Sequence, residues 1–586
     1  MPTSQRSFLQ IPYPSRLYFV IDSSAKRRNN AQPVTEFSKR DLANRSFFGG
    51  LLLLLCALTF YYFAVLRIDY QKTALPDLGP YPDATEYFAQ AKALSEGRWP
   101  SIQIGYEKLP SRYPPGYPAL MLPWLKILPQ THSVLAPFRT NQTIGLLLLL
   151  TVFTFYAYLA MPVTGGLAAL LLATLPGFFT FSRSSLSEMS VCLLIVTAFM
   201  FAYLGLQEER RWKIYVSAAC LGLSLNIRIQ SLFFAPLLLT MAVLPIKGMR
   251  LRWWLHCAAV PVVFVLAASP VLVLNTIQFH SPFKTGYDFW IPYFGEKHLF
   301  FLLRYVPRNA GDLWRELSLQ PHMYDAANIF GTGTSFVPAF VLLSCVGMFF
   351  VRLNWFLGCG LLAGFSSFAA ALCFLFGQDE RLYLPLLILL IGFAVLPVTW
   401  AVNNLFAGRR SIFALAVLVL FAAACLGYPS RSGYKTRDID RSQAWDALHF
   451  STSPREPIQF AAQRYFGMRL QQEPGIVLSD VDPVYLNALL PSGFVAAPID
   501  GKHHYKWSYT WRYDRPQALA LVQRRLTQSL PVYALFVSKR EMEEKTSRLP
   551  RVDGYDWVLV DDSNAKAAIL KLTPKSKQAS GSRSAS

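Results

Sequence analysis

The run IGLLLLLTVFTFYAYLA, from Ile144 to Ala160, contains no charged side chain. It is long enough to cross a lipid bilayer as a helix, which takes about 20 apolar residues. Runs of the same kind recur from Leu51 to Leu66, Val191 to Leu206 and Ser411 to Leu426. Together they predict a polytopic α-helical membrane protein.

The composition of the whole chain agrees with this fold class. Among its 586 residues, 53% are hydrophobic and 16% are charged, against roughly 45–50% and 25% in soluble proteins. These proportions exclude a soluble enzyme, an intrinsically disordered chain and a collagen-like fibre. The 8 cysteines fall in or beside apolar segments, where a thiol behaves as a small hydrophobic group, so neither a disulfide framework nor a zinc site is expected.

The formal net charge of +21 comes from basic residues in short clusters between apolar runs and in the two tails. This placement indicates membrane topology rather than a nucleic-acid partner. Residues 1–45 are polar and basic and predict a cytoplasmic tail, followed by residues 46–428 as a membrane domain. We expect about eleven spans in that domain. They are Leu51 to Leu66, Ile144 to Ala160, Leu167 to Phe181, Ser187 to Leu206, Ile214 to Leu225, Leu232 to Ile246, Leu255 to Leu274, Ser335 to Val351, Trp355 to Phe376, Leu382 to Val402 and Ser411 to Leu426.

Charge placement decides how the stretch from Ile214 to Ile246 crosses the membrane. Basic clusters on both sides of it should be cytoplasmic, so an even number of spans must separate them. Two short helices turning near Asn226 to Gln230 meet this condition. The same counting places the loops 67–139 and 276–334, and everything after residue 428, on the external face.

Residues 429–572 change in composition and predict an extracytoplasmic soluble α/β domain, and residues 573–586 a disordered tail. Short apolar runs predict its strands and longer periodic stretches its helices. The strands are Gly475 to Ser479, Val532 to Val537, Trp557 to Val560 and Ala568 to Leu572, and the helices are Ile458 to Leu470 and Pro516 to Gln528.

The first external loop carries the residues that point to chemistry. Asp83 precedes Tyr87, Ala91 and Leu94 at helical spacing, which predicts an amphipathic helix lying on the membrane with Asp83 at its amino end. Aspartate also caps helices without any other function. Further along, the segment RYPPGYP starting at Arg112 fixes a cation and two phenols at the interface, although an aromatic belt would show the same residues.

Three later segments complete a pattern. They are SRSSLSE ending at Glu188, SPFKTGY ending at Tyr287 after Asn275, and ERLYLP starting at Glu380. In this order, with Asp83 and the RYPPGYP segment, they resemble the GT-C class of membrane glycosyltransferases. The protein O-mannosyltransferases and the bacterial aminoarabinose transferases of lipid A are the most similar families by pattern. The resemblance covers roughly Phe48 to Leu390.

The resemblance implies an inverting transfer of a hexosyl or pentosyl unit from a polyprenyl-phosphate donor to an envelope acceptor, a lipid, glycan or protein, on the external face of the membrane. The short loops and the carboxyl-terminal domain favour a bacterial inner membrane. Asp83 would be the general base. Cations would hold the leaving phosphate, with Arg381 first and Arg112, Arg183 and Lys284 behind it. The remaining candidates for substrate binding are Glu86, Tyr87, Tyr113, Tyr117, Glu188 and Tyr287.

Each assignment has an alternative. Arg381 could lie at the interface or pair with Asp379 or Glu380, and Glu188 could complement the dipole of a helix start. Arg228, between two apolar helices, is either used or marks an external turn. Glu188 stands where the family usually has aspartate, so a divalent metal ion, the one cofactor that the family suggests, stays open. A transporter or flippase of a lipid-linked sugar, or an envelope scaffold, are the other functions considered.

Overall fold

The structure is a computed structural model, and it describes residues 36–67, 83–175, 178, 181–244, 253–317, 344, 346–347, 354–377, 380–405, 465–466, 475–479, 481–499, 503–504, 512–513, 515–561 and 567–575. The chain forms two compact units, Met1–Ser46 and Phe47–Ser586. Helix α1 (Glu36–Tyr61) begins in the first unit, and the contacts described below lie in the second.

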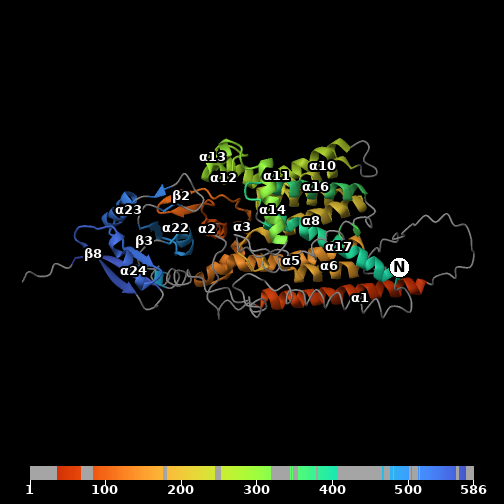
Figure 1. The fold of residues 1–586 in the computed structure, drawn as a ribbon, viewed down its shortest axis with the longest axis horizontal. Coiled ribbons are helices and arrows are strands. Elements are labelled where there is room, and N and C mark those ends of the chain that lie inside the picture. Colours follow the sequence, from red (N-terminus) through yellow and green to blue (C-terminus); the bar gives the residue numbers. More distant parts are fainter. Residues whose placement is uncertain are drawn as a thin grey trace, which may run out of the picture. The chain divides into compact units, whose positions relative to one another are not determined.

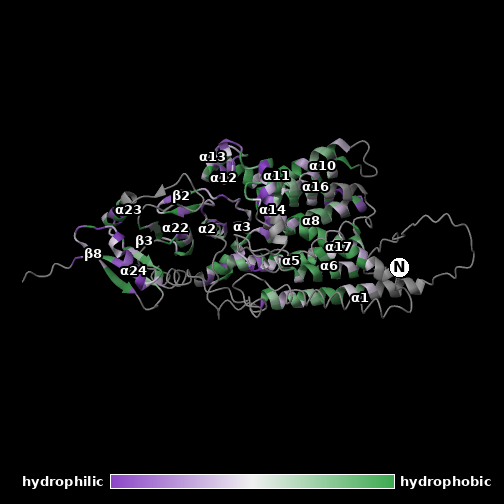
Figure 2. Cartoon of the chain, viewed as in Figure 1, coloured by the Kyte–Doolittle hydropathy of each residue, from purple (hydrophilic) through white to green (hydrophobic). Residues whose placement is uncertain are grey.

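The described residues include five helices that are long and apolar enough to cross a bilayer, as expected of a multi-pass membrane protein. These spans are Ser46–Leu66, His132–Leu159, Glu188–Gln207, Trp253–Phe279 and Arg381–Thr399. The helices involved pack on one another, α5 (Ala136–Leu159) on α6 (Pro162–Thr174) and α8 (Glu188–Gln207), and α9 (Arg211–Leu225) on α8 and α11 (Trp253–Phe279) (Figure 1). Figure 2 shows α5, α6, α8 and α17 (Leu384–Leu405) as predominantly hydrophobic.

The predicted spans agree with these helices in most places. Helix α9 ends at Leu225 and the next helix begins at Ile229, so the predicted turn between two short helices is confirmed. Helix α10 (Pro236–Val243) continues that second segment, and α16 (Asn354–Cys373) matches a later predicted span. The span Ser411 to Leu426 lies outside the described residues, and so does almost all of Ser335 to Val351. The total of eleven therefore stays a prediction.

The loop after the first span folds into helix α2 (Asp83–Ser95), a hairpin of β1 (Ile102–Ile104) and β2 (Glu107–Leu109), and short helices α3 (Gly116–Leu120) and α4 (Leu122–Ile127). The prediction of an amphipathic helix on the membrane surface is wrong for α2. Every residue from Asp83 to Ala91 is buried, because α2 packs against α3, α4, β1 and a helix of the carboxyl-terminal region.

The four predicted strands of the carboxyl-terminal region are present, and three further strands were not predicted. These are β4 (Val495–Pro498) and the two-residue strands β5 (His503–His504) and β6 (Arg512–Tyr513), which pair with each other. Strands β3 (Ile476–Ser479), β4, β7 (Val532–Phe536), β8 (Tyr555–Asp561) and β9 (Ala568–Pro574) form a sheet of order β4-β3-β7-β9-β8. Helix α22 (Pro483–Leu489) connects the parallel strands β3 and β4, since parallel neighbours need a crossover. Helices α23 (Arg515–Thr527) and α24 (Lys539–Lys545) follow.

Candidate active site

Asp83 is the first residue of α2, and its carboxylate is bound on two sides. The Nη2 atom of Arg381 lies 2.8 Å from Oδ2 of Asp83, and the hydroxyl group of Tyr113 donates a hydrogen bond to Oδ1. Only 7% of Asp83 is exposed. The two residues that the sequence ranks first, the base and the leading cation, therefore form one ion pair.

A second carboxylate joins the same cation. Nη1 of Arg381 lies 3.6 Å from Oε1 of Glu188, at the start of α8, and Nη1 of Arg228 lies 2.7 Å from the same oxygen. Two carboxylates and two guanidinium groups thus alternate in a single network. The sequence drew attention to Arg228 through its position between apolar helices, but did not assign it to the site.

Close backbone approaches bring these distant segments together. The backbone N–H of Gly116 donates to the carbonyl oxygen of Asn226 over 2.7 Å, and a Cβ atom at Gly116 would lie 2.4 Å from that oxygen. A larger residue would push the turn that carries Arg228 away from the first loop. The PPGYP segment is thus fixed against the α9 turn, which places Arg228 beside Glu188.

The aromatic candidates line the same region. The ring centroid of Tyr87 lies 4.9 Å from that of Tyr113 and 5.1 Å from that of Tyr117, and Tyr113 meets Tyr287 edge-on at 5.9 Å. The hydroxyl group of Tyr87 shares a hydrogen bond of 2.9 Å with Ser187, one residue before Glu188. Aromatic rings at these separations attract one another, so the four tyrosines form one aromatic cluster.

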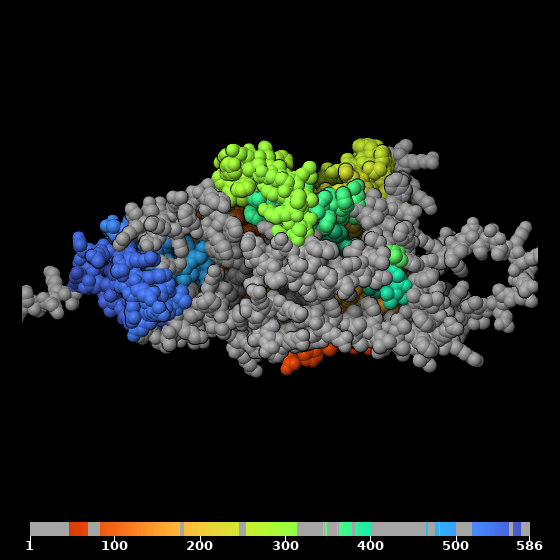
Figure 3. All heavy atoms as spheres, viewed as in Figure 1, coloured from red at the N-terminus to blue at the C-terminus, as the bar shows by residue number. Residues whose placement is uncertain are grey.

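Tyr287 of this aromatic cluster lies in helix α12 (Gly286–Trp290). Thr285 and Asp288 form a capping box that starts the helix, and a Cβ atom at Gly286 would lie 1.9 Å from the carbonyl oxygen of Ser111. Glycine therefore lets α12 touch the first loop. Beyond it, Phe289 and Tyr293 are exposed, and the residues around them form part of the face in Figure 3 (light green).

Glu86 and Arg112 pair with each other rather than with Asp83. Nη1 of Arg112 lies 3.1 Å from Oε1 of Glu86, and the backbone N–H of Arg112 and the hydroxyl group of Ser111 both donate to Oε2. Arg112 also covers the ring of Trp290 at 5.4 Å. Because Glu86 is fully buried and Arg112 is only 4% exposed, this ion pair stabilises the fold of the first loop.

Arg183 and Lys284 are the two remaining candidates for the donor phosphate. Arg183 donates to the carbonyl oxygen of Ala64 over 3.5 Å, and Lys284 is exposed. Their part in binding the donor phosphate stays a prediction.

The electrostatics of the site favour an ionised Asp83. Burial alone raises the pKa of its carboxyl group, but Arg381, the hydrogen bond from Tyr113 and the charge of Arg228 together hold the pKa below 3.8. Burial also raises the pKa of Tyr113 well above its ordinary value and that of Tyr287 to about 12. Both phenols therefore stay protonated at neutral pH, and Tyr113 remains a donor to Asp83.

The same contacts test the site for a divalent metal ion. In the part of the chain that the structure describes, no three His, Cys, Asp or Glu side chains lie together as a metal ion would require. Asp83 and Glu188 each bind a guanidinium group, and a metal ion bound to these carboxylates would have to displace it. This set of side chains does not fit a resident divalent cation.

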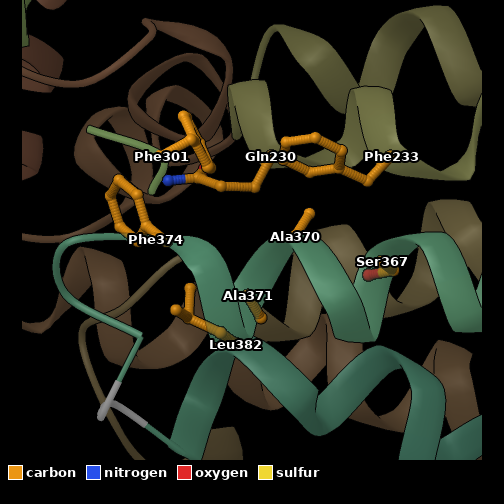
Figure 4. Close-up of a pocket in the computed structure, with 8 residues that line it drawn as sticks. All are labelled: Gln230, Phe233, Phe301, Ser367, Ala370, Ala371, Phe374 and Leu382. Atoms are coloured by element: carbon orange, nitrogen blue, oxygen red, sulfur yellow. The ribbon is translucent and has the colours of Figure 1, made fainter. Parts of the chain in front are cut away.

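A small pocket is lined by residues that are close in sequence to both arginines of the network. Its lining includes Gln230, two residues after Arg228, and Leu382, next to Arg381 (Figure 4). Three phenylalanines close it, with the ring of Phe301 at 5.5 Å from Phe233 and 5.1 Å from Phe374. The pocket is small, about 20 Å³, and most of the side chains that line it are apolar.

The carboxyl-terminal region forms hydrogen bonds with the other end of helix α2. Nζ of Lys92 donates to the carbonyl oxygens of Asn487, at 2.9 Å, and Leu490. The side-chain amide of Asn487 in turn donates to the carbonyl oxygen of Gln103 over 2.8 Å. The helix that begins with Asp83 is therefore anchored at one end by Arg381 and at the other by α22.

No protein-family model and no curated protein sequence matches this chain. Solved structures do match. ArnT from Cupriavidus metallidurans, in the apo state and bound to undecaprenyl phosphate, is 13% identical, with TM-scores of 0.54 and 0.53, over 89% of this chain and 97% of that one. An oligosaccharyltransferase from Archaeoglobus fulgidus, in complex with zinc and sulfate, matches with a TM-score of 0.50 at 13% identity, over 89% of this chain and 72% of that one.

At such identities the match concerns the fold alone. It extends over nearly the whole length of ArnT, from the membrane helices into the carboxyl-terminal region. This chain therefore has the fold of the GT-C class of membrane glycosyltransferases, the class that its sequence motifs resemble.

Proposed function

We propose that this protein is a membrane glycosyltransferase that moves a sugar from a polyprenyl-phosphate donor to a hydroxyl group of an envelope acceptor. The observation that carries the proposal is the network of Asp83, Arg381, Glu188 and Arg228 in a GT-C fold, in which both carboxylates are buried. A base for the acceptor and two cations for a phosphate are the groups that such a transfer needs.

The proposed reaction is a single displacement with inversion. The acceptor oxygen forms a bond with the anomeric carbon of the sugar while the bond from that carbon to the phosphate oxygen breaks. The hydroxyl proton moves to Asp83, and polyprenyl phosphate leaves with the electron pair. Arg381 and Arg228 stabilise the charge that develops on the phosphate.

Donor binding would also change the basicity of Asp83. With Arg381 in place, the pKa of Asp83 lies below its ordinary value, so the carboxylate is a weak base. A donor phosphate competes for the same guanidinium group. As Arg381 turns towards the phosphate, the largest influence that lowers the pKa is weakened, and Asp83 gains proton affinity when a proton must be accepted.

The apolar pocket supports a donor with a hydrocarbon tail. Phe233, Phe301, Phe374 and Leu382 would supply apolar side chains against which the first prenyl units pack, while the phosphate lies on Arg228 and Arg381 (Figure 4). The bound undecaprenyl phosphate of ArnT supports the same class of donor. We further propose that the protein resides in a bacterial inner membrane, with an external domain at residues 429–572 that approaches the acceptor.

The experiment is transfer of radiolabelled sugar from a panel of undecaprenyl-phosphate sugars into membrane extracts, by purified wild-type protein and by Asp83→Asn. Asp553→Asn, which changes an exposed carboxylate, is the matched control. We expect transfer by wild type and control, a loss of at least about 100-fold in Asp83→Asn, and no effect of EDTA. Equal transfer by Asp83→Asn would remove Asp83 as the base. No transfer by any protein, with competent donors and acceptors, would favour a transporter.

A further inference from the structure

A second cationic cluster lies where the hairpin of the first loop meets helix α23. Tyr106 occupies the turn between β1 and β2, and the guanidinium carbons of Arg524 and Arg525 lie 5.0 Å and 4.7 Å from the centre of its ring. The turn is fixed in place, because the backbone N–H of Gly105 donates to the carbonyl oxygen of Ala496 over 2.9 Å.

This cluster contains polar atoms that the protein leaves unsatisfied. Arg525 is 8% exposed, and its Nε atom and the hydroxyl group of Tyr106 are both buried without a hydrogen-bond partner. No ion pair joins Arg524 or Arg525 to a carboxylate among the residues that the structure describes. Stacking on Tyr106 accounts for the position of the guanidinium groups but not for the two unsatisfied donors.

A buried arginine cannot resolve this by losing its proton. The guanidinium group stays charged in proteins, and a buried charge without a counter-charge is unfavourable. Burial lowers the pKa of Arg525, which has the direction expected of a cation without an anionic neighbour. An anion between the two arginines would accept from Nε and from the phenol, and would neutralise the charge.

We propose that Arg524, Arg525 and Tyr106 bind an anionic group, a phosphate or a carboxylate, on the acceptor of the transfer reaction. The proposal rests on the glycosyltransferase function given above. A planar guanidinium group binds such oxyanions through two parallel N–H donors, and a second arginine and a phenol hydroxyl complete a three-sided site.

The position of the cluster favours the acceptor over the donor. In the proposed function the donor phosphate is held by Arg381 and Arg228, whereas the Tyr106 turn lies seven residues before Tyr113, which binds Asp83. Seven residues of extended chain span at most about 25 Å. An acceptor that reaches Asp83 with a hydroxyl group and the cluster with an anion therefore has the size of a glycolipid headgroup or an oligosaccharide.

The first test measures anion binding without transfer. Wild-type protein in phosphatidylcholine nanodiscs is labelled with phenylglyoxal, with and without inorganic phosphate at constant ionic strength, and each arginine is followed by peptide mass spectrometry. We expect phosphate to slow labelling of Arg524 at least threefold, and not to affect Arg540, an exposed arginine of the same region. Protection should disappear in Arg525→Gln and weaken in Tyr106→Phe.

Both variants should remain folded, since each removes an unsatisfied polar group. Unchanged labelling of Arg524 in the presence of phosphate would overturn the site. Equal protection in Arg525→Gln would also overturn it, because the effect would then be one of bulk ions.

The second test connects the cluster to the acceptor. Arg525→Gln should raise KM for the acceptor at least fivefold and leave KM for the donor unchanged, with Arg540→Gln as the control. A rise in KM for the donor alone would contradict the assignment. Asp83→Asn separates the two proposals, because it should abolish transfer while phosphate still protects Arg524. If wild-type protein transfers no sugar, the labelling experiment still decides whether the anion site exists.

Discussion

At the scale of single residues, the ion pair of Asp83 and Arg381 predicts the pH dependence of transfer. Arg381 and the hydrogen bond from Tyr113 hold the pKa of Asp83 below that of an ordinary aspartate, so kcat/KM should fall only when the pH drops through this lowered pKa. Arg381→Gln removes the strongest influence that lowers the pKa, and Tyr113→Phe removes a hydrogen bond. The acid limb should move to higher pH in both variants, further in Arg381→Gln.

The measurement is kcat/KM against pH for the three proteins. Samples incubated at low pH and assayed at pH 7 control for irreversible unfolding. An acid limb at the same pH in all three proteins would mean that another group titrates.

A second residue-scale prediction concerns the pair of Arg228 and Glu188. Removing one partner of a buried ion pair costs about 3–5 kcal/mol when the other charge is left uncompensated. Because Arg381 still lies 3.6 Å from Glu188, Arg228→Gln should lower the free energy of unfolding by no more than about this amount. Lys213 and Glu208 have the same N···O distance as Arg228 and Glu188, 2.7 Å, but lie near the surface. Lys213→Gln should therefore cost less than about 1 kcal/mol.

Denaturant unfolding in detergent micelles gives both values. The double variant Arg228→Gln/Glu188→Gln should recover most of the loss while still failing to transfer sugar, because the phosphate has lost a cation. A double variant as unstable as Arg228→Gln would show that the two side chains do not stabilise each other.

The sequence predicts part of this site and not the rest. Asp83 and Arg381 stand at recognisable motif positions, and the structure joins them directly. Arg228 has no motif, and its partner Glu188 lies 40 residues away, so only the packing of the Asn226 turn on Gly116 reveals the pair. Glu86 and Arg112 fit the motifs equally well, yet they bind each other. A sequence pattern cannot distinguish a structural ion pair from a pair of reactive residues.

At the scale of elements, the apolar helices are largely predictable and the polar ends are not. Helix α5 begins at Ala136, whereas the prediction started at Ile144, because Asn141 and Gln142 look like loop residues. Both are buried in the helix, where Asn141 donates to the carbonyl oxygens of Ser184 and Leu186. Partners so distant in sequence leave no local signal. The β1–β2 hairpin is local in sequence, but each of its strands has only three residues, too few for an alternating pattern to stand out.

The anchoring of α2 by Lys92 predicts how stability varies with pH. Burial lowers the pKa of Lys92 from 10.5 to about 8, although Glu96 acts in the opposite direction. Between pH 8 and 10.5 the unfolded chain therefore holds a proton that the folded chain has released, so stability should rise with pH across this window. Lys92→Met lacks this contribution.

The check is Tm at several pH values from 7 to 10.5 for wild-type protein and Lys92→Met, with Lys539→Met as an exposed control. The difference in Tm between wild type and Lys92→Met should shift in favour of wild type above pH 8. Parallel curves for all three proteins would indicate that Lys92 has an ordinary pKa and no buried contact with α22.

At the scale of the whole molecule, the hydrogen bonds from the first loop to the carboxyl-terminal sheet constrain the topology. Gly105 binds Ala496 and Gln103 binds Asn487, so the loop and the sheet must lie on one face of the membrane. An odd number of predicted spans separates the cluster at Arg210 and Arg211 from Lys539. If the first loop is external, Lys539 is external and that cluster is cytoplasmic.

Two single-cysteine variants test this arrangement in a chain whose 8 native cysteines are replaced. Lys539→Cys and Trp212→Cys both change exposed side chains. A membrane-impermeant maleimide should label Lys539→Cys in intact spheroplasts, and Trp212→Cys only after permeabilisation. Labelling of both before permeabilisation would mean an even number of crossings between them. That result would also place the basic loop at Arg210 and Arg211 outside the cytoplasm. The argument from basic residues for an external Asp83 would then fail.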